Sequence, residues 1–278
     1  WTSDQYSQYG TKVISSTARD ATYVLDGILD NETELCILEH TTDTSGYTEL
    51  VFALFDLLNM RFSPRIRDIG EQRLYRIDEK IKYNNVETVL KGKINCKIII
   101  DNWDNLVKVA GSLKFGCVTA SLLINKLQSY TSQNELTKTL REYGRLIKTI
   151  FILRYLTDES YRRQINKQLN KGEALHALRK FISFAQRGQI YRSQIIEQTN
   201  QASCLNLITN AVVTWNTVYM NATIQQLRKE GKVVCEDDIA HLSPARYEHI
   251  NPYGKYYFNI EEEFNRDQLR PLRTKTLA

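Results

Sequence analysis

Two carboxylates, Asp43 and Glu173, have residue types and settings that suit metal-assisted chemistry on phosphate. Asp43 lies in Glu39-His-Thr-Thr-Asp-Thr-Ser-Gly46, where an apolar strand pattern gives way to polar and glycine residues. Glu173 lies in Asn170-Lys-Gly-Glu-Ala-Leu-His176, and we expect it to open an amphipathic helix among lysines and arginines. A strand-end aspartate and a helix-borne glutamate are hard oxygen ligands of the kind that hold Mg²⁺ for phosphoryl transfer. This interpretation requires the two carboxylates to converge in space.

Lysine and arginine concentrate in one block of the chain. Between Lys138 and Arg192 there are thirteen Lys or Arg against four acids, a local balance of +9, whereas the whole chain carries +5. The remainder is therefore mildly acidic, at −4. A basic block in such a protein favours a polyanionic partner such as DNA. A set of solvated helix faces is the alternative explanation.

Composition excludes several other classes of protein. The five cysteines form no CxxC pair and there are only four histidines, so we predict neither a zinc site nor a disulfide framework. We expect the cysteines to be free thiols in a reducing cytoplasm. The most apolar run, Leu50–Leu58, is interrupted by Asp56, and we expect no membrane partner. The chain begins with Trp1, and we expect it to be a fragment of a longer protein.

The first 70 residues alternate between strand and helix patterns. We predict strands at Thr11–Thr17, Glu34–Thr42 and Phe62–Ile69, with helices at Asp20–Leu29 and Thr48–Met60. Pro64 confines the third strand to a sheet edge. This alternation is typical of an α/β layer structure.

Helical periodicity dominates the rest of the chain. Apart from a strand pattern at Cys96–Ile100, it runs from about residue 102 to 170. Ser132-Gln-Asn-Glu135 matches a capping box opening a helix through Leu156, and Asp158 is expected to cap the next helix.

A break at Lys171-Gly172 is then expected to precede a helix over Glu173–Arg187. A further helix is predicted at Ala202–Lys229, stopped by Gly231, with a loop-like tail from Pro244. We therefore predict three segments: 1–70, an incomplete α/β core; 71–170, a mainly helical insertion; and 171–278, the core helix carrying Glu173 plus a helical C-terminal region.

Several long motifs resemble one known family. They are Gly10-Thr-Lys-Val-Ile14, Arg19-Asp-Ala-Thr-Tyr-Val-Leu-Asp-Gly-Ile28, His40-Thr-Thr-Asp-Thr-Ser-Gly-Tyr47, Pro64-Arg-Ile-Arg-Asp68, Leu169-Asn-Lys-Gly-Glu-Ala-Leu-His-Ala-Leu-Arg-Lys180 and His249-Ile-Asn-Pro-Tyr-Gly-Lys-Tyr256. Together they resemble the catalytic core of bacterial replicative transposases, the TnpA proteins of the Tn-three family. The resemblance covers nearly the whole chain. It implies an α/β (α+β) fold, an RNase H-like core with a large all-helical insertion before the last acidic residue.

The resemblance also implies roles for the two acids. Asp43 would be the second and Glu173 the third acid of a DDE triad, 130 residues apart. The first Asp of such a triad lies on the first strand of the fold, upstream of Thr11–Thr17. Asp4 is the only acid before that strand pattern and lacks a preceding apolar strand. We therefore expect the first Asp to lie outside this chain and the isolated fragment to be inactive.

The activity implied is that of a DDE-type polynucleotidyl transferase. Such an enzyme uses two Mg²⁺ ions, for which Mn²⁺ can substitute. It cleaves transposon 3′ ends and joins them to target DNA in replicative (cointegrate) transposition. The partners are transposon inverted-repeat ends, target DNA and a second subunit of a homodimer, in the bacterial cytoplasm at the nucleoid. An RNase H-like nuclease or resolvase, and a non-catalytic DNA-binding module, are the alternatives.

The residues expected to contact DNA all lie in the basic block. Lys180 and His176 share a helical face with Glu173, at spacings that suit contacts to phosphate near the scissile site. The expected backbone contacts are Arg162, Arg163, Lys167, Arg179 and Arg187. For each of them, an exposed side chain without a partner is the alternative.

Overall fold

The computed structural model describes residues 1–14, 23–43, 47–83, 85–129, 134–183 and 188–255. It is a mixed, helix-rich structure with two small sheets. The chain forms two compact units, Trp1–Glu173 and Ala174–Ala278. No helix among the described residues has the length and apolarity needed to cross a membrane.

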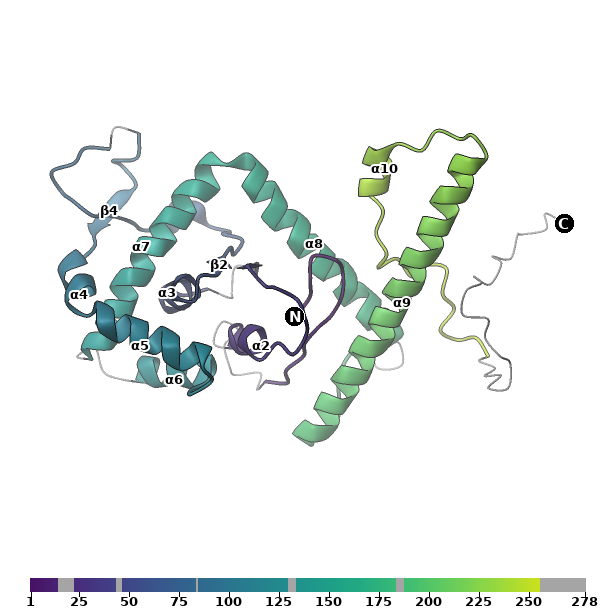
Figure 1. Cartoon of the computed structure of the whole chain (residues 1–278), viewed down its shortest axis with the longest axis horizontal. Helices are drawn as coiled ribbons and strands as arrows, with labels where there is room; N and C mark the ends of the chain where they lie inside the picture. Colours follow the sequence, from purple (N-terminus) through teal and green to yellow (C-terminus); the bar gives the residue numbers. More distant parts are fainter. Residues whose placement is uncertain (15–22, 44–46, 84, 130–133, 184–187, 256–278) are drawn as a thin grey trace. The chain divides into compact units, whose positions relative to one another are not determined.

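Helix α3 (Glu49–Leu57) forms the centre of the first unit. Its residues from Leu50 to Phe55 are all buried, so the helix is surrounded on every side rather than amphipathic. Thr48 caps its first turn, accepting a hydrogen bond from the Val51 amide at 3.4 Å. Figure 1 shows α3 end-on with other helices around it, and α7 (Glu135–Thr157) is its main partner.

The helices around α3 follow the predicted helical stretch. Asn134 caps α7 by accepting a hydrogen bond from the Thr137 amide at 3.3 Å, whereas the predicted capping residue Ser132 lies outside the described residues. Asp158 caps the following helix as expected, through the Tyr161 amide at 2.9 Å. The other helices of this unit are α2 (Asp26–Leu29), α4 (Cys96–Asp101), α5 (Trp103–Lys114), α6 (Ala120–Ser129) and the 3₁₀ turn η2 (Ile69–Glu71).

The sheets are shorter than the sequence predicts. Strand β1 (Glu39–His40) pairs in parallel with β2 (Arg61–Phe62), where strands at Glu34–Thr42 and Phe62–Ile69 were expected. The predicted strand at Thr11–Thr17 is absent over 11–14, and its remainder lies outside the described residues. A second parallel pair, β3 (Leu74–Arg76) with β4 (Leu90–Lys93), has no counterpart among the predicted strands.

Two predictions of local structure are wrong. Cys96–Ile100 is helical, as part of α4, because Asn95 caps it and Ile99 faces the core, which outweighs the strand preference of three successive isoleucines. Glu173 does not open a helix, since α8 runs without a break over Glu159–Ile182. A glycine inside a helix costs only about 1 kcal/mol relative to alanine, so Gly172 is accommodated there.

The second unit contains the end of α8, the long helix α9 (Ile195–Lys229) and α10 (Glu236–Ala240). Helix α9 begins earlier than the predicted Ala202 and ends before Gly231, whose φ of +76° requires the left-handed conformation that glycine adopts readily. The Asn216 side chain of α9 donates to the carbonyls of Pro244 and Arg246, at 2.7 and 2.8 Å. These bonds attach the C-terminal loop to the helix.

Candidate active site

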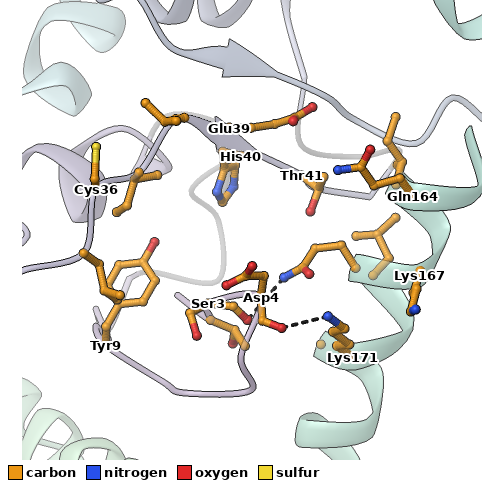
Figure 2. Close-up of a pocket in the computed structure, with 18 residues that line it drawn as sticks. Ser3, Asp4, Tyr9, Cys36, Glu39, His40, Thr41, Gln164, Lys167 and Lys171 are labelled. Carbon is orange, nitrogen blue, oxygen red and sulfur yellow. Dashed lines mark hydrogen bonds between the residues drawn. The ribbon is translucent and has the colours of Figure 1, made fainter. Parts of the chain in front are cut away.

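A cavity of about 560 Å³ lies in the first unit, between three segments that are far apart in the sequence. One wall comes from Thr2–Asp4 with Tyr9, and a second from the stretch Leu35–Thr41, which contains β1. The third comes from residues of α8 between Gln164 and Gly172. Figure 2 shows side chains from all three segments directed into this space.

Asp43 and Glu173 follow two of the segments that line this cavity, but neither side chain is among the lining residues. Asp43 is exposed and follows Thr41, the last cavity residue of its segment, by two positions. Glu173 is also exposed and directly follows Gly172, the last cavity residue of α8. The fold therefore directs the strand end and the helix toward one region. Within the part of the chain that the structure describes, however, no three His, Cys, Asp or Glu side chains are grouped closely enough to hold a metal ion.

Helix α8 presents a polar face to the cavity. Gln164, Lys167, Gln168 and Lys171 recur at intervals of three or four residues, so they lie on one side of the helix. The Lys171 ammonium donates to the Asp4 carbonyl at 2.7 Å, and the Gln168 amide donates to the Ser3 carbonyl at 3.3 Å (Figure 2). These bonds attach the N-terminal segment to α8.

His40 contributes a neutral polar group to the cavity. Its ring packs against Phe55 and Phe62, with centroids 5.9 and 6.3 Å away, and its imidazole points into the space shown in Figure 2. Burial lowers the pKa of His40 to about 4, so the ring is uncharged at neutral pH. It can therefore donate one hydrogen bond and accept another, without adding charge beside Asp43.

One edge of β1 has no strand beside it in the part of the chain that the structure describes. The amides of Arg61, Ser63 and Arg65 donate to the carbonyls of Leu38, His40 and Thr42, each at 2.8 Å. Since main-chain groups alternate along a strand, those of Glu39 and Thr41 face the opposite edge. Among the described residues no strand lies beside that edge, and this stretch of chain lines the cavity.

Comparison with known proteins decides the family. The family model described as the Tn3 transposase DDE domain matches residues 1–256. The chain belongs to this family. The resemblance inferred from the motifs is thereby confirmed.

Individual members of the Tn3 transposase family are similar over almost all of this chain. The transposase for transposon Tn1546 of Enterococcus faecium is 45% identical over 273 residues, which are 98% of this chain and 28% of that protein. The transposase for transposon Tn501 of Pseudomonas aeruginosa is 44% identical, over 98% of this chain and 27% of its own. The transposase for transposon gamma-delta of Escherichia coli (strain K12) is 39% identical, over 97% of this chain and 27% of its own. The chain spans little more than a quarter of the length of these relatives.

The basic residues predicted to contact DNA have different environments in this Tn3-family domain. Lys167 lines the cavity, and His176 and Lys180 are exposed on α8. Arg162 is engaged elsewhere, since its guanidinium donates to the carbonyls of Tyr155 and Leu156 at the end of α7, at 2.6 and 2.7 Å.

The remaining predicted contacts are also unequal. Arg163 pairs with Glu159 at 2.7 Å. Arg179 is half-buried, burial lowers its pKa, and its Nε has no hydrogen-bond partner among the described residues. Arg187 lies outside the described residues. Binding of DNA by any of them stays a prediction.

Two features of the site had no counterpart in the sequence predictions. Lys171 falls at the predicted helix break, although its spacing of four from Lys167 already places both on one helical face. A hydrogen-bonded group formed by Glu39, Ser63 and Tyr161 also joins three elements next to the cavity. No sequence signal could have found it, because its members are 24 to 122 residues apart.

Proposed function

We propose that this chain is the catalytic domain of a DNA transposase that cleaves the 3′ ends of a transposon and joins them to target DNA in replicative transposition. In this proposal Asp43 and Glu173 are the catalytic, metal-binding acids. One observation carries it: the strand segment that leads to Asp43 and the helix that bears Glu173 line the same cavity, in a chain of the Tn3 transposase DDE domain family.

The donor set suits a hard divalent cation. Asp43 and Glu173 offer carboxylate oxygens, the ligands that Mg²⁺ and Mn²⁺ prefer, and Mg²⁺ commonly binds through one or two carboxylates together with substrate phosphates. Bound Mg²⁺, one or two ions, would stabilise charge on the attacking and leaving oxygens of an in-line displacement. Both side chains are exposed, so DNA phosphates have access to them.

We further propose that the core is RNase H-like and that the remaining carboxylate, the first Asp of the triad, lies on a strand added at the open edge of β1. A parallel strand beside Glu39 and Thr41 would pair the main-chain groups that have no strand partner among the described residues, and it would enter the cavity that this edge lines. The lack of a three-ligand group among the described residues agrees with a carboxylate supplied by another segment. On this basis the fragment alone should not cleave DNA.

Residues of α8 would bind and orient the DNA. Lys167 and Lys171 line the cavity, and Lys171, which donates to the Asp4 carbonyl, keeps two further N–H donors. Both ammonium groups could pair with backbone phosphates and fix the register of the duplex. His176 and Lys180 are exposed on the same side of α8 as Glu173, a different side from Lys167 and Lys171, and would contact phosphates near that acid. The substrates proposed are the inverted-repeat ends and target DNA, bound by a homodimer of the full-length protein.

The test is Mg²⁺-dependent nicking of a transposon-end duplex by the full-length transposase. We expect Asp43→Asn and Glu173→Gln each to reduce nicking at least a thousandfold, because each removes a charged ligand without changing side-chain size. Matched controls are Asp104→Asn on α5 and Glu197→Gln on α9, exposed acids without a side-chain partner among the described residues. These should keep normal activity. Normal nicking by either test variant would refute the assignment.

A further inference from the structure

Three polar side chains from three elements meet beside the cavity. Glu39 comes from β1, Ser63 follows β2, and Tyr161 lies in the first turn of α8. The Tyr161 hydroxyl donates to the Glu39 carboxylate at 3.0 Å, and the Ser63 hydroxyl is hydrogen-bonded to both partners. Ser63 is 0% and Tyr161 3% exposed. We refer to these three residues as the Glu39–Ser63–Tyr161 junction.

Burial makes the geometry of this junction demanding. The buried hydroxyls of Ser63 and Tyr161 are costly unless hydrogen-bonded, so they must keep their distances to the Glu39 carboxylate. That carboxylate is partly exposed and also pairs with Arg61 at 3.3 Å. Burial also raises the pKa of Tyr161 to about 12, which leaves its phenol protonated and able to donate. Apolar contacts are non-directional and permit sliding, whereas these bonds fix one position of α8 against the strands.

The Tyr161 ring is held from its other sides as well. The Arg154 guanidinium lies over the ring, 4.1 Å from its centroid, and Phe151 packs edge-on at 6.3 Å. Both residues belong to α7, which packs along the central helix α3. Removing the Tyr161 hydroxyl alone would therefore leave the ring in place.

The junction lies where the two proposed catalytic segments meet. Glu39 precedes Asp43 by four residues on the strand segment, and Tyr161 precedes Glu173 by twelve on one unbroken helix. From the junction onward, both segments line the same cavity. A displacement of α8 at Tyr161 would be carried along the helix to Glu173, about 18 Å further on at 1.5 Å per residue.

We infer that the Glu39–Ser63–Tyr161 junction is a positioning device for the transposase reaction, which sets the separation between the strand bearing Asp43 and the helix bearing Glu173. We assign its residues a positioning role, exerted through the two acids. The inference rests on the proposed function, since it concerns how well those acids bind one metal ion together. Mg²⁺ demands near-ideal geometry, so a loosened junction weakens metal binding first.

The experiment measures nicking of a transposon-end duplex by the full-length transposase over a range of Mg²⁺ concentrations. Tyr161→Phe should raise the Mg²⁺ concentration for half-maximal nicking about tenfold, the equivalent of one hydrogen bond to a charged group. The matched control is Tyr155→Phe, a buried tyrosine that packs against the same Phe151, with centroids 5.7 Å apart. Its Mg²⁺ dependence should be that of the unaltered protein.

A second variant separates positioning from general loss of stability. Ser63→Ala should also raise the Mg²⁺ concentration for half-maximal nicking. The double variant, Ser63→Ala with Tyr161→Phe, should raise it by less than the two single effects combined, because both side chains act on Glu39. A purely structural role would lower resistance to urea and leave half-saturation by Mg²⁺ unchanged, which would overturn the inference. Asp43→Asn is assayed alongside: if it still nicks, the proposed function fails, and if only the Tyr161→Phe shift is missing, this inference alone fails.

Discussion

At the scale of single residues, the carboxylate of Asp26 is buried outside the cavity and fully engaged in polar contacts. Its side chain is 0% exposed, pairs with Lys12 at 2.7 Å and accepts a hydrogen bond from the Ser121 amide at 2.9 Å. It thereby joins α2 to the first turn of α6. Although burial opposes ionisation, the hydrogen bonds from Lys12 and Ser121 hold the pKa of Asp26 below its ordinary value.

This lowered pKa predicts a stability that depends on pH. A carboxyl whose pKa is lower in the folded state stabilises fully above its unfolded pKa, and that contribution is lost as pH falls through the folded value. We expect Asp26→Asn to cost about 1.5 to 3 kcal/mol at pH 7, the range for hydrogen bonds to charged groups. The difference from the unaltered protein should shrink below about pH 4. Urea unfolding of the variant and the unaltered protein at pH 7 and pH 3 measures their difference in unfolding free energy at each pH. The same difference at both pH values would contradict the prediction.

At the scale of elements, two helical glycines should respond oppositely to alanine. A Cβ added at Gly144 of α7 would lie 1.9 Å from the Glu49 carbonyl oxygen of α3, so the two central helices would have to separate. At Gly172 of α8 a Cβ would meet nothing within 4 Å. We expect Gly144→Ala to destabilise by about 1 to 3 kcal/mol or more, and Gly172→Ala to stabilise by about 0.5 to 1 kcal/mol.

Urea unfolding of the two variants, monitored by circular dichroism, measures this contrast. Each is the control of the other, because the chemical change is the same and only the neighbours differ. Similar changes in unfolding free energy would show that α3 and α7 are not in close contact at Gly144.

Elements with strong local signals could be predicted from the sequence. The apolar run after Thr48 predicts α3, and the helical periodicity up to Leu156 predicts α7. Asp158, as a capping residue, predicts the start of α8. Prediction failed where tertiary burial outweighed local preference, as at Ile98–Ile100, or where a glycine needed no special conformation, as at Gly172. The pair β3 and β4 was missed because short strands in a polar, charged stretch leave little periodicity.

At the scale of the whole molecule, the site could be predicted only in part. The motifs around Asp43 and Glu173 predict the two acids, and the fold brings the segments that precede them to one cavity. The Glu39–Ser63–Tyr161 junction and the neutral His40 depend on contacts between distant segments, which no local pattern encodes. Charge alone also could not distinguish Lys167, at the cavity, from Arg162, whose guanidinium is bound to the end of α7.

This difference among the cations predicts how DNA binding should depend on salt. Each phosphate contact that is lost lowers the slope of log K against log salt concentration by about 0.9. We expect Lys167→Gln and Lys171→Gln each to reduce the slope by that amount in the full-length transposase. Lys114→Gln, an exposed lysine of α5 outside the basic block, makes the same change in net charge and should leave the slope unaltered. Fluorescence anisotropy of a labelled duplex, titrated at several salt concentrations, measures the slopes. Equal effects from all three variants would mean that net charge, rather than the cavity face of α8, governs binding.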